Sequence, residues 1–355
     1  MAGGPSPRGL QGVRSMNPKW MTIPSLFRTA GFSLIVAMPL HAQGGKTFME
    51  WLKEYSPTGY FIITDYETRA NKPGDHKQFL SVTTSPVGAT AVHEICHMRN
   101  SMLSQNNSTS YFIGNGKDYK FATTFTPFNS KEIMADIPAS LENFQTDVYI
   151  SGKAGTDGAY SQVGGLYGIF EEFDAYVTEV KATVEMAPCF KANFNKPEHW
   201  EDLAGEIVTS VWSNSEFRYF SLRYIMWAKA KHPDVYTKIM ASKEIRECYS
   251  HLVRFAEESM NGWIAVLTEQ KMDTKTGNGF NWYWKFWNEI QKPEYKELEK
   301  LLLIETVGLA PENRLMVRRS PFPAGMIQGR FDLQGRTIPS RAAVGGNRFL
   351  ISPGN

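Results

Sequence analysis

Two histidines and a glutamate in the segment HEICH, residues 93–97, have the types and spacing of a metal site. On a helix, residues four apart lie on one face, so His93 and His97 can offer two imidazole nitrogens to one ion. Glu94, the next residue along, then points beside that ion, where the general base for a water activated by zinc must sit. The pattern therefore predicts a site for Zn²⁺ and a hydrolytic reaction.

Two histidines leave a zinc ion short of one protein ligand, with a further position open for water. A metzincin would supply a third histidine in the pattern H-E-x-x-H-x-x-G-x-x-H. The positions that would need Gly and His hold Asn100 and Leu103, which excludes that class.

An acidic segment further along, EEFDAY at residues 171–176, offers carboxylates on otherwise apolar ground. Such acids are costly to bury unless they are paired with a cation or a metal. Together with HEICH, the segment resembles the gluzincin-type zinc peptidases, in which a ligand Glu is followed three positions later by a small residue, as Glu172 is by Ala175. The resemblance implies Glu172 as the third ligand. Glu171 remains the rival, because a small difference in helix phase would bring it to the metal instead.

The mechanism that this resemblance implies is metal-assisted hydrolysis of a peptide bond. Zinc lowers the pKa of water towards about 7, and Glu94 takes the proton and passes it to the leaving amine. The tetrahedral intermediate also needs a hydrogen-bond donor, for which Tyr160, Tyr167 and His251 are candidates. Asp174 could orient a zinc-bound histidine.

The elements that position these residues are predicted from periodicity. A helix from Val87 to about Leu103, opened by Ser85 and Pro86, presents the HEICH segment, and strands at residues 59–64 and 78–84 precede it as a small sheet. A second buried helix begins at Leu166. Further strands are expected at 111–113 and 119–125, a helix broken at Pro138 at 131–144, a Gly-rich loop at 151–165, and helices at 197–212, 215–231, 242–270, 281–290 and 293–306. The fold class is α+β, with a small N-terminal sheet, a mainly helical C-terminal half that closes a cleft, and a short β tail.

The composition limits the function classes. The 355 residues, 42% of them hydrophobic, can bury a substantial core, and a formal net charge of +2 gives no electrostatic reason to expect nucleic acid. Of the aromatic cluster at residues 280–287, Tyr283, Phe286 and Trp287 fall on one helical face, which predicts core packing over a stacking surface for sugars or peptides.

The two ends of the chain differ from its middle. Lys19 and Arg28 precede an apolar run at residues 30–40 and a small-residue exit at Ala42, so residues 1–42 are expected to be a leader and signal peptide. That run is too short to span a membrane. We therefore expect a bacterial protein that is secreted, periplasmic or at the cell surface, with no membrane span.

The metallopeptidase domain is expected to cover residues 43–308, followed by a basic segment at 309–355. Expected strands at 329–338 and 347–352 loosely resemble the C-terminal sorting modules of some Gram-negative secreted proteins; a disordered basic tail is the alternative. In an exported protein Cys189 and Cys248 could pair, and Cys96 is expected to be a buried thiol that points away from the metal.

These observations predict a secreted zinc metallopeptidase that acts on a peptide or protein substrate. The alternative is a secreted, non-catalytic zinc protein that contacts a glycan or another protein. Hydrolysis of a non-peptide amide would use the same residues. Glu94 favours an enzyme, because a purely structural zinc site needs no base beside it and more often has a fourth protein ligand.

Overall fold

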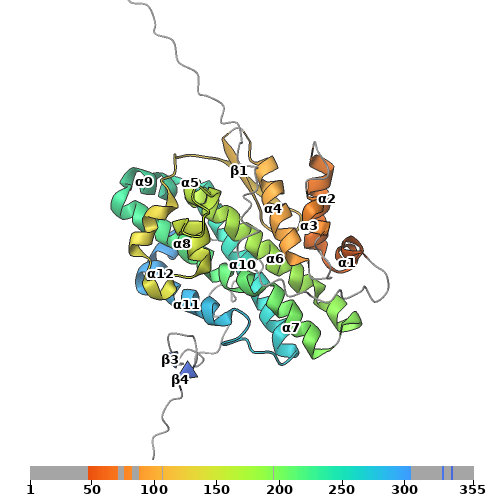
Figure 1. The fold of residues 1–355 in the computed structure, drawn as a ribbon. Coiled ribbons are helices and arrows are strands. Elements are labelled where there is room, and N and C mark those ends of the chain that lie inside the picture. Colours follow the sequence, from red (N-terminus) through yellow and green to blue (C-terminus); the bar gives the residue numbers. More distant parts are fainter. Residues whose placement is uncertain are drawn as a thin grey trace, which may run out of the picture. The chain divides into compact units, whose positions relative to one another are not determined.

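The computed structural model describes residues 47–70, 76–81, 88–105, 107–194 and 196–304, together with the pairs 330–331 and 337–338 (Figure 1). The expected leader at 1–42, the expected helix start at Ser85 and Pro86, and the expected strand at 347–352 lie outside these residues.

The elements that precede Leu166 are mostly short. They are the helices α1 (Phe48–Tyr55), α2 (Pro57–Arg69), α3 (Lys77–Ser81) and α4 (Ala89–Leu103), the strands β1 (Ser108–Phe112) and β2 (Asp118–Ala122), the 3₁₀ turns η3 (Ser130–Asp136) and η4 (Ala139–Leu141), the π-helical turn η5 (Thr146–Ser151) and the short helix α5 (Tyr160–Val163). The HEICH motif lies on α4.

The remaining elements are mainly long helices. They are α6 (Leu166–Asn193), α7 (Pro197–Glu206), α8 (Val208–Lys231), α9 (Pro233–Ala241), α10 (Lys243–Glu269), α11 (Phe280–Ile290) and α12 (Pro293–Leu302), followed by the two-residue strands β3 (Arg330–Phe331) and β4 (Thr337–Ile338). The protein is thus mainly helical, with one five-residue antiparallel hairpin, β1–β2, as the larger of its two sheets among these residues.

Helix α6 is the centre of the helical core. It packs against α4, α8 and α10, and Figure 1 shows it running between α4 and α10. Phe170, Phe173, Val177 and Val180 have no exposed surface. A helix with so many buried positions must be enclosed by neighbours, which explains why other helices cover it on several sides.

The start of α6 requires a glycine. Gly165 has φ +53°, and a Cβ atom there would meet the main-chain oxygen of Phe128 and the hydroxyl of Tyr224. Only glycine combines that backbone conformation with so close an approach. The backbone at the start of α6 can therefore pack closely against Phe128, which lies just before η3.

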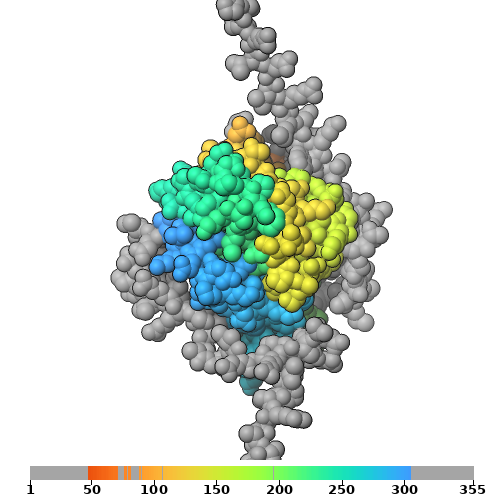
Figure 2. Space-filling model, turned by 90° about the vertical axis from the view of Figure 1, so that its left-hand side faces the viewer, coloured from red at the N-terminus to blue at the C-terminus, as the bar shows by residue number. Residues whose placement is uncertain are grey.

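The segment from η3 to η5 lies along the C-terminal helices. Glu132 in η3 accepts a hydrogen bond from the indole of Trp227 and forms an ion pair of 2.8 Å with His232, at the end of α8. Figure 2 shows this segment in yellow beside the green α9 and the blue α11 and α12. The region predicted as a helix at 131–144 is therefore made of 3₁₀ turns fixed by contacts to α8.

The predicted sheet before the motif helix is wrong. Residues 59–64 belong to α2, and residues 78–81 of the second expected strand belong to α3. Ser56 caps α2 and Pro57 occupies its first turn, while Glu185 of α6 accepts hydrogen bonds from the Thr58 backbone N–H and hydroxyl. The apolar run that suggested a strand is part of a helix that buries Ile62, Ile63 and Tyr66 and whose start is held from α6.

Other predictions have mixed outcomes. The hairpin strands, α6 and α10 with its Ser242 cap are confirmed; α9 was missed, and the helix expected at 197–212 is interrupted at Ile207. Both β3 and β4 fall inside the single strand expected at 329–338. Tyr283, Phe286 and Trp287 are buried, as predicted for core packing.

The pairing of Cys189 with Cys248, which the sequence left open, does not occur. Both side chains are buried and form no disulfide, and the same holds for Cys96. Within the described ranges, no helix combines the length and the apolar character that crossing a membrane requires.

Candidate metal centre

Helix α4 brings the two motif histidines together on one face. The Nε2 atoms of His93 and His97 lie 2.9 Å apart, and the two rings meet edge to face. His93 is buried, whereas His97 and Glu94 are partly exposed. Two nitrogens that converge so closely are placed to share a single ligand.

Glu172 of α6 completes a three-residue group. One ligand atom from each of His93, His97 and Glu172 lies within 4.8 Å of the other two. Glu172 Oε2 is 3.4 Å from His97 Nε2, is buried, and makes no hydrogen bond within the described part of the chain. A buried carboxylate oxygen without a partner is costly, and a cation at this point would satisfy it. Two imidazoles and a carboxylate are also the donor set that zinc takes in hydrolytic sites, so the residues fit this ion.

Glu171 contacts the other side of His97. Its Oε1 lies 2.6 Å from His97 Nδ1, the ring nitrogen that faces away from His93 Nε2. Of the two acids that the sequence left open, Glu172 therefore lies beside the converging nitrogens and Glu171 behind the imidazole. A carboxylate in that position fixes the ring orientation and the tautomer.

Glu179 lies behind His93 as Glu171 lies behind His97, and sequence reasoning missed it. Its Oε2 lies 3.2 Å from His93 Nδ1, and both side chains are buried. Glu179 follows Glu172 by seven residues, which returns to the same face of a helix. That spacing on α6 is the signal that could have identified it.

The charges around His97 favour its protonated form when no metal is bound. Burial alone would lower the pKa of His97, but the carboxylates of Glu171 and Glu172 outweigh it and hold the pKa well above its usual range. A metal must displace that proton, because only neutral imidazole coordinates.

Two tyrosines border the group. The ring centroid of Tyr176 lies 4.3 Å from that of His93, and the Tyr176 hydroxyl is 2.7 Å from that of Tyr149 in η5. Burial raises the pKa of both tyrosines well above 10, and the charges of Glu172 and Glu94 raise them further. Both hydroxyls therefore keep their hydrogens at neutral pH.

The donors predicted for the tetrahedral intermediate have other surroundings. The Tyr167 hydroxyl accepts a hydrogen bond from the Thr124 N–H, and His251 packs against Tyr119. Tyr160 is half-exposed at the start of α5, where burial and the charge of Glu171 raise its pKa to about 12. Among these three residues, only Tyr160 has a pKa that is raised by a carboxylate of the site, that of Glu171.

The predicted role of Asp174 is wrong. Its Oδ2 accepts hydrogen bonds of 2.7 Å from Asn100 Nδ2 and from the Phe112 N–H, so it links α4, α6 and β1 and leaves the histidines to Glu171 and Glu179. Burial raises its pKa to about 7. Cys96 lies beside it, with its sulfur 3.9 Å from Oδ2, and is a buried thiol as expected.

The arrangement combines three potential ligands, two carboxylates behind the imidazoles, a carboxylate on the motif helix and two hydroxyl donors. In that order they are His93, His97 and Glu172; Glu171 and Glu179; Glu94; and Tyr149 and Tyr176. Such a set can bind a divalent ion, move a proton and donate hydrogen bonds to an anionic oxygen. Comparison of the chain with protein-family models, with curated proteins and with solved structures gave no match.

Proposed function

We propose that the protein is a zinc-dependent hydrolase that cleaves peptide bonds. The observation that supports this most is the convergence of His93, His97 and Glu172, of which one ligand atom each lies within 4.8 Å of the others, with the two Nε2 atoms 2.9 Å apart. These three residues would hold the ion, which would supply a Lewis acid for the carbonyl and acidify water.

Glu94 is the general base in this proposal. It follows His93 on α4, and its charge is felt by the hydroxyls of Tyr149 and Tyr176. Its carboxylate takes one proton from water as the oxygen attacks the carbonyl carbon. The same proton then passes to the leaving nitrogen as the C–N bond breaks, which leaves Glu94 ionised again.

Glu171 and Glu179 hold the two imidazoles in place. Glu171 accepts the Nδ1 proton of His97, and the Glu179 carboxylate lies 3.2 Å from His93 Nδ1, so both Nε2 atoms face inward. Because Glu172 lies on the same helix, one rigid element sets the positions of a ligand and of both orienting groups.

The setting of the reaction is part of the same proposal. We take the leader predicted at residues 1–42 to direct the protein out of the cytoplasm, where it would meet peptide or protein substrates. The non-catalytic alternative has less support, because the aromatic residues that would contact a glycan are largely buried, as for Tyr283 and Phe286. Hydrolysis of a non-peptide amide is separated from peptide cleavage by the substrate assay.

The test combines metal content with one substitution. Purified protein should contain one zinc per chain by elemental analysis, and Glu94→Gln should keep the zinc but cleave a peptide library about 10²- to 10⁴-fold more slowly. Glu297→Gln, an exposed acid on α12, is the matched control and should leave both unchanged. Protein without zinc, or a fully active Glu94→Gln variant, would overturn the proposal.

A second comparison tests the ligand assignment. Glu172→Gln should lose zinc to a chelator far more readily than Glu171→Gln. The amide introduced at position 171 can still accept a hydrogen bond from His97 Nδ1, whereas position 172 loses its anionic donor to the metal. Competition with a chromophoric chelator measures both affinities. The reverse order would assign the third ligand to Glu171.

A further inference from the structure

Gln145 connects the candidate site to α8 through hydrogen bonds of fixed direction. The side chain is buried at the start of η5. Its Oε1 accepts a hydrogen bond of 2.8 Å from Trp212 Nε1, and Ser213 Oγ lies 2.8 Å from the same oxygen. An indole N–H can only donate, so the amide cannot be reversed. Gln145 Nε2 therefore faces the Tyr176 hydroxyl, 3.1 Å away, and donates to it.

The hydrogens of the tyrosine pair can be counted. Tyr149 and Tyr176 have two hydroxyl hydrogens, and the 2.7 Å bond between the hydroxyls uses one. Gln145 adds a third hydrogen and accepts none from the pair. One hydroxyl hydrogen is thus left without an acceptor in the part of the chain that the structure describes.

The surroundings indicate which hydroxyl holds that hydrogen. Tyr176 is only 7% exposed, whereas Tyr149 is partly exposed. A hydroxyl that accepts a hydrogen bond becomes a better donor. Donation by Gln145 therefore favours the order Gln145 to Tyr176 to Tyr149, which leaves the Tyr149 hydrogen at the outer end.

We propose that the Tyr149 hydroxyl donates to the oxyanion of the tetrahedral intermediate, and that Gln145, held by Trp212, is a positioning residue that sets the direction of this relay. The inference rests on the proposed hydrolase function. Tyr149 is suited to the task because its hydroxyl is bonded to that of Tyr176, whose ring contacts His93 with 4.3 Å between the centroids. The acceptor that the described residues do not offer is supplied by the substrate oxygen once negative charge develops there.

The test is steady-state kinetics on one cleaved peptide, together with zinc content. Tyr149→Phe should lower kcat about 10²-fold, with KM and zinc content unchanged, because it removes one oxyanion donor. Gln145→Glu, which can only accept when ionised, and Gln145→Leu should each lower kcat about 10-fold by reversing or breaking the relay. Tyr236→Phe on α9, whose ring is stacked by Lys229, is the matched control and should have wild-type kinetics.

A double variant separates positioning from a structural role. If Gln145 acts through Tyr149, then Gln145→Leu should cause no further loss in the Tyr149→Phe background. Losses that multiply would overturn the relay and assign Gln145 a separate structural role. A Tyr149→Phe variant with full kcat would also overturn it.

A binding readout is independent of turnover. Wild-type protein should bind a phosphinic peptide, which mimics the tetrahedral geometry, and Tyr149→Phe should weaken that binding by about the same factor as kcat while binding of a planar hydroxamate changes little. Equal effects on both ligands would refute oxyanion donation. If Glu94→Gln is inactive and retains zinc while the Tyr149 variants are normal, only the relay fails; if zinc is absent, the proposed function fails.

Discussion

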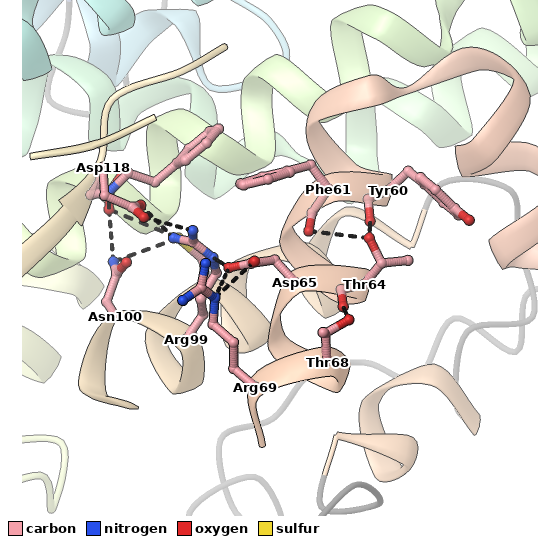
Figure 3. Close-up of polar contacts among 12 residues, drawn as sticks. Tyr60, Phe61, Thr64, Asp65, Thr68, Arg69, Arg99, Asn100 and Asp118 are labelled. Atoms are coloured by element: carbon pink, nitrogen blue, oxygen red, sulfur yellow. Dashed lines mark hydrogen bonds and ion pairs between the residues drawn. The ribbon is translucent and has the colours of Figure 1, made fainter. Parts of the chain in front are cut away.

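Replacing Arg99 by Met should destabilise the protein by about 3 kcal/mol. Arg99 is fully buried on α4, two residues beyond His97, and Figure 3 shows its guanidinium between Asp65 of α2 and Asp118 of β2. Its Nε lies 2.8 Å from Asp65, and its Nη1 and Nη2 lie 2.6 and 2.8 Å from the two oxygens of Asp118. The substitution removes three charge-assisted hydrogen bonds and leaves two carboxylates without the cation between them.

The magnitude follows from what remains after the substitution. Breaking a buried ion pair by removing one partner costs about 3–5 kcal/mol. The lower end applies here, because Asp118 keeps 25% of its side-chain surface exposed and Asp65 keeps its ion pair with Arg69. Met fills much of the volume between the rings of Phe61 and Phe112, so the change is mainly electrostatic.

Urea denaturation followed by circular dichroism measures the change in unfolding free energy. Arg69→Met is the matched control: its i,i+4 pair with Asp65 is 51% exposed on the arginine side, and such pairs contribute about 0.3–0.5 kcal/mol. A loss below about 1 kcal/mol for Arg99→Met, or equal losses for the two variants, would refute the reasoning. It would mean that the buried guanidinium is not what joins α2, α4 and the hairpin.

Three further predictions follow from single contacts. Glu179→Gln should weaken zinc binding about 10- to 100-fold in a chelator competition, because it removes the carboxylate behind His93; unchanged affinity would show that the ring is held by other means. Glu216, whose two carboxyl oxygens make no hydrogen bonds within the described residues, has a pKa that burial holds well above its usual range, so the folded state binds its proton more tightly than the unfolded state. The contribution of protonated Glu216 to stability is fully present below the unfolded pKa near 4.5 and is lost as pH rises towards the folded pKa. Glu216→Gln should therefore stabilise the protein increasingly as pH rises above about 5, by about 1.4 kcal/mol per pH unit until the folded pKa is reached. A gain that does not depend on pH in thermal melts would contradict this. Gly168→Ala should cost about 1–3 kcal/mol, since its Cβ would overlap the main-chain oxygen of Tyr160 and force α5 away from α6; a melting temperature equal to that of the wild type would count against this tight packing.

The sequence was sufficient for helices whose ends and periodicity agree. Ser242 accepts a hydrogen bond from the Ile245 N–H at the start of α10, as its residue type predicts, and the apolar spacing located α4 and α6. It failed for α2, because a short apolar run such as Tyr60 to Ile63 is compatible with a strand or with a buried segment of a helix. Glu185, more than a hundred residues away, holds the start of that helix, and no local pattern contains this contact.

The residues of the candidate site also fall into those that a local pattern predicts and those that only the packing of the helices reveals. The spacing of His93 and His97 is a local property of one helix, and their Nε2 atoms converge as that spacing predicts. Tyr149 lies in the π-helical turn η5 and Gln145 directly precedes it, in a region that the sequence presents only as the edge of a loop. Their positions depend on Trp212 of α8, so their part in the site became visible only when the helices were packed together.

The direction in which Glu172 projects depends on the rotation of α6 about its axis more than on the number of residues between the HEICH and EEFDAY segments. At 3.6 residues per turn each residue turns the helix by about 100°, so Glu179 and Tyr176 project within about 20° and 40° of Glu172, whereas Glu171 projects about 100° away. Phe173 and Val177, both without exposed surface, fix this rotation through the core. Glu172 therefore faces the histidine nitrogens and Glu171 reaches His97 from behind because of apolar packing, whatever lies in the chain between them. A change that rotated α6 would displace the ligand, both orienting carboxylates and Tyr176 together, so the core of this protein and the chemistry of its site cannot vary independently.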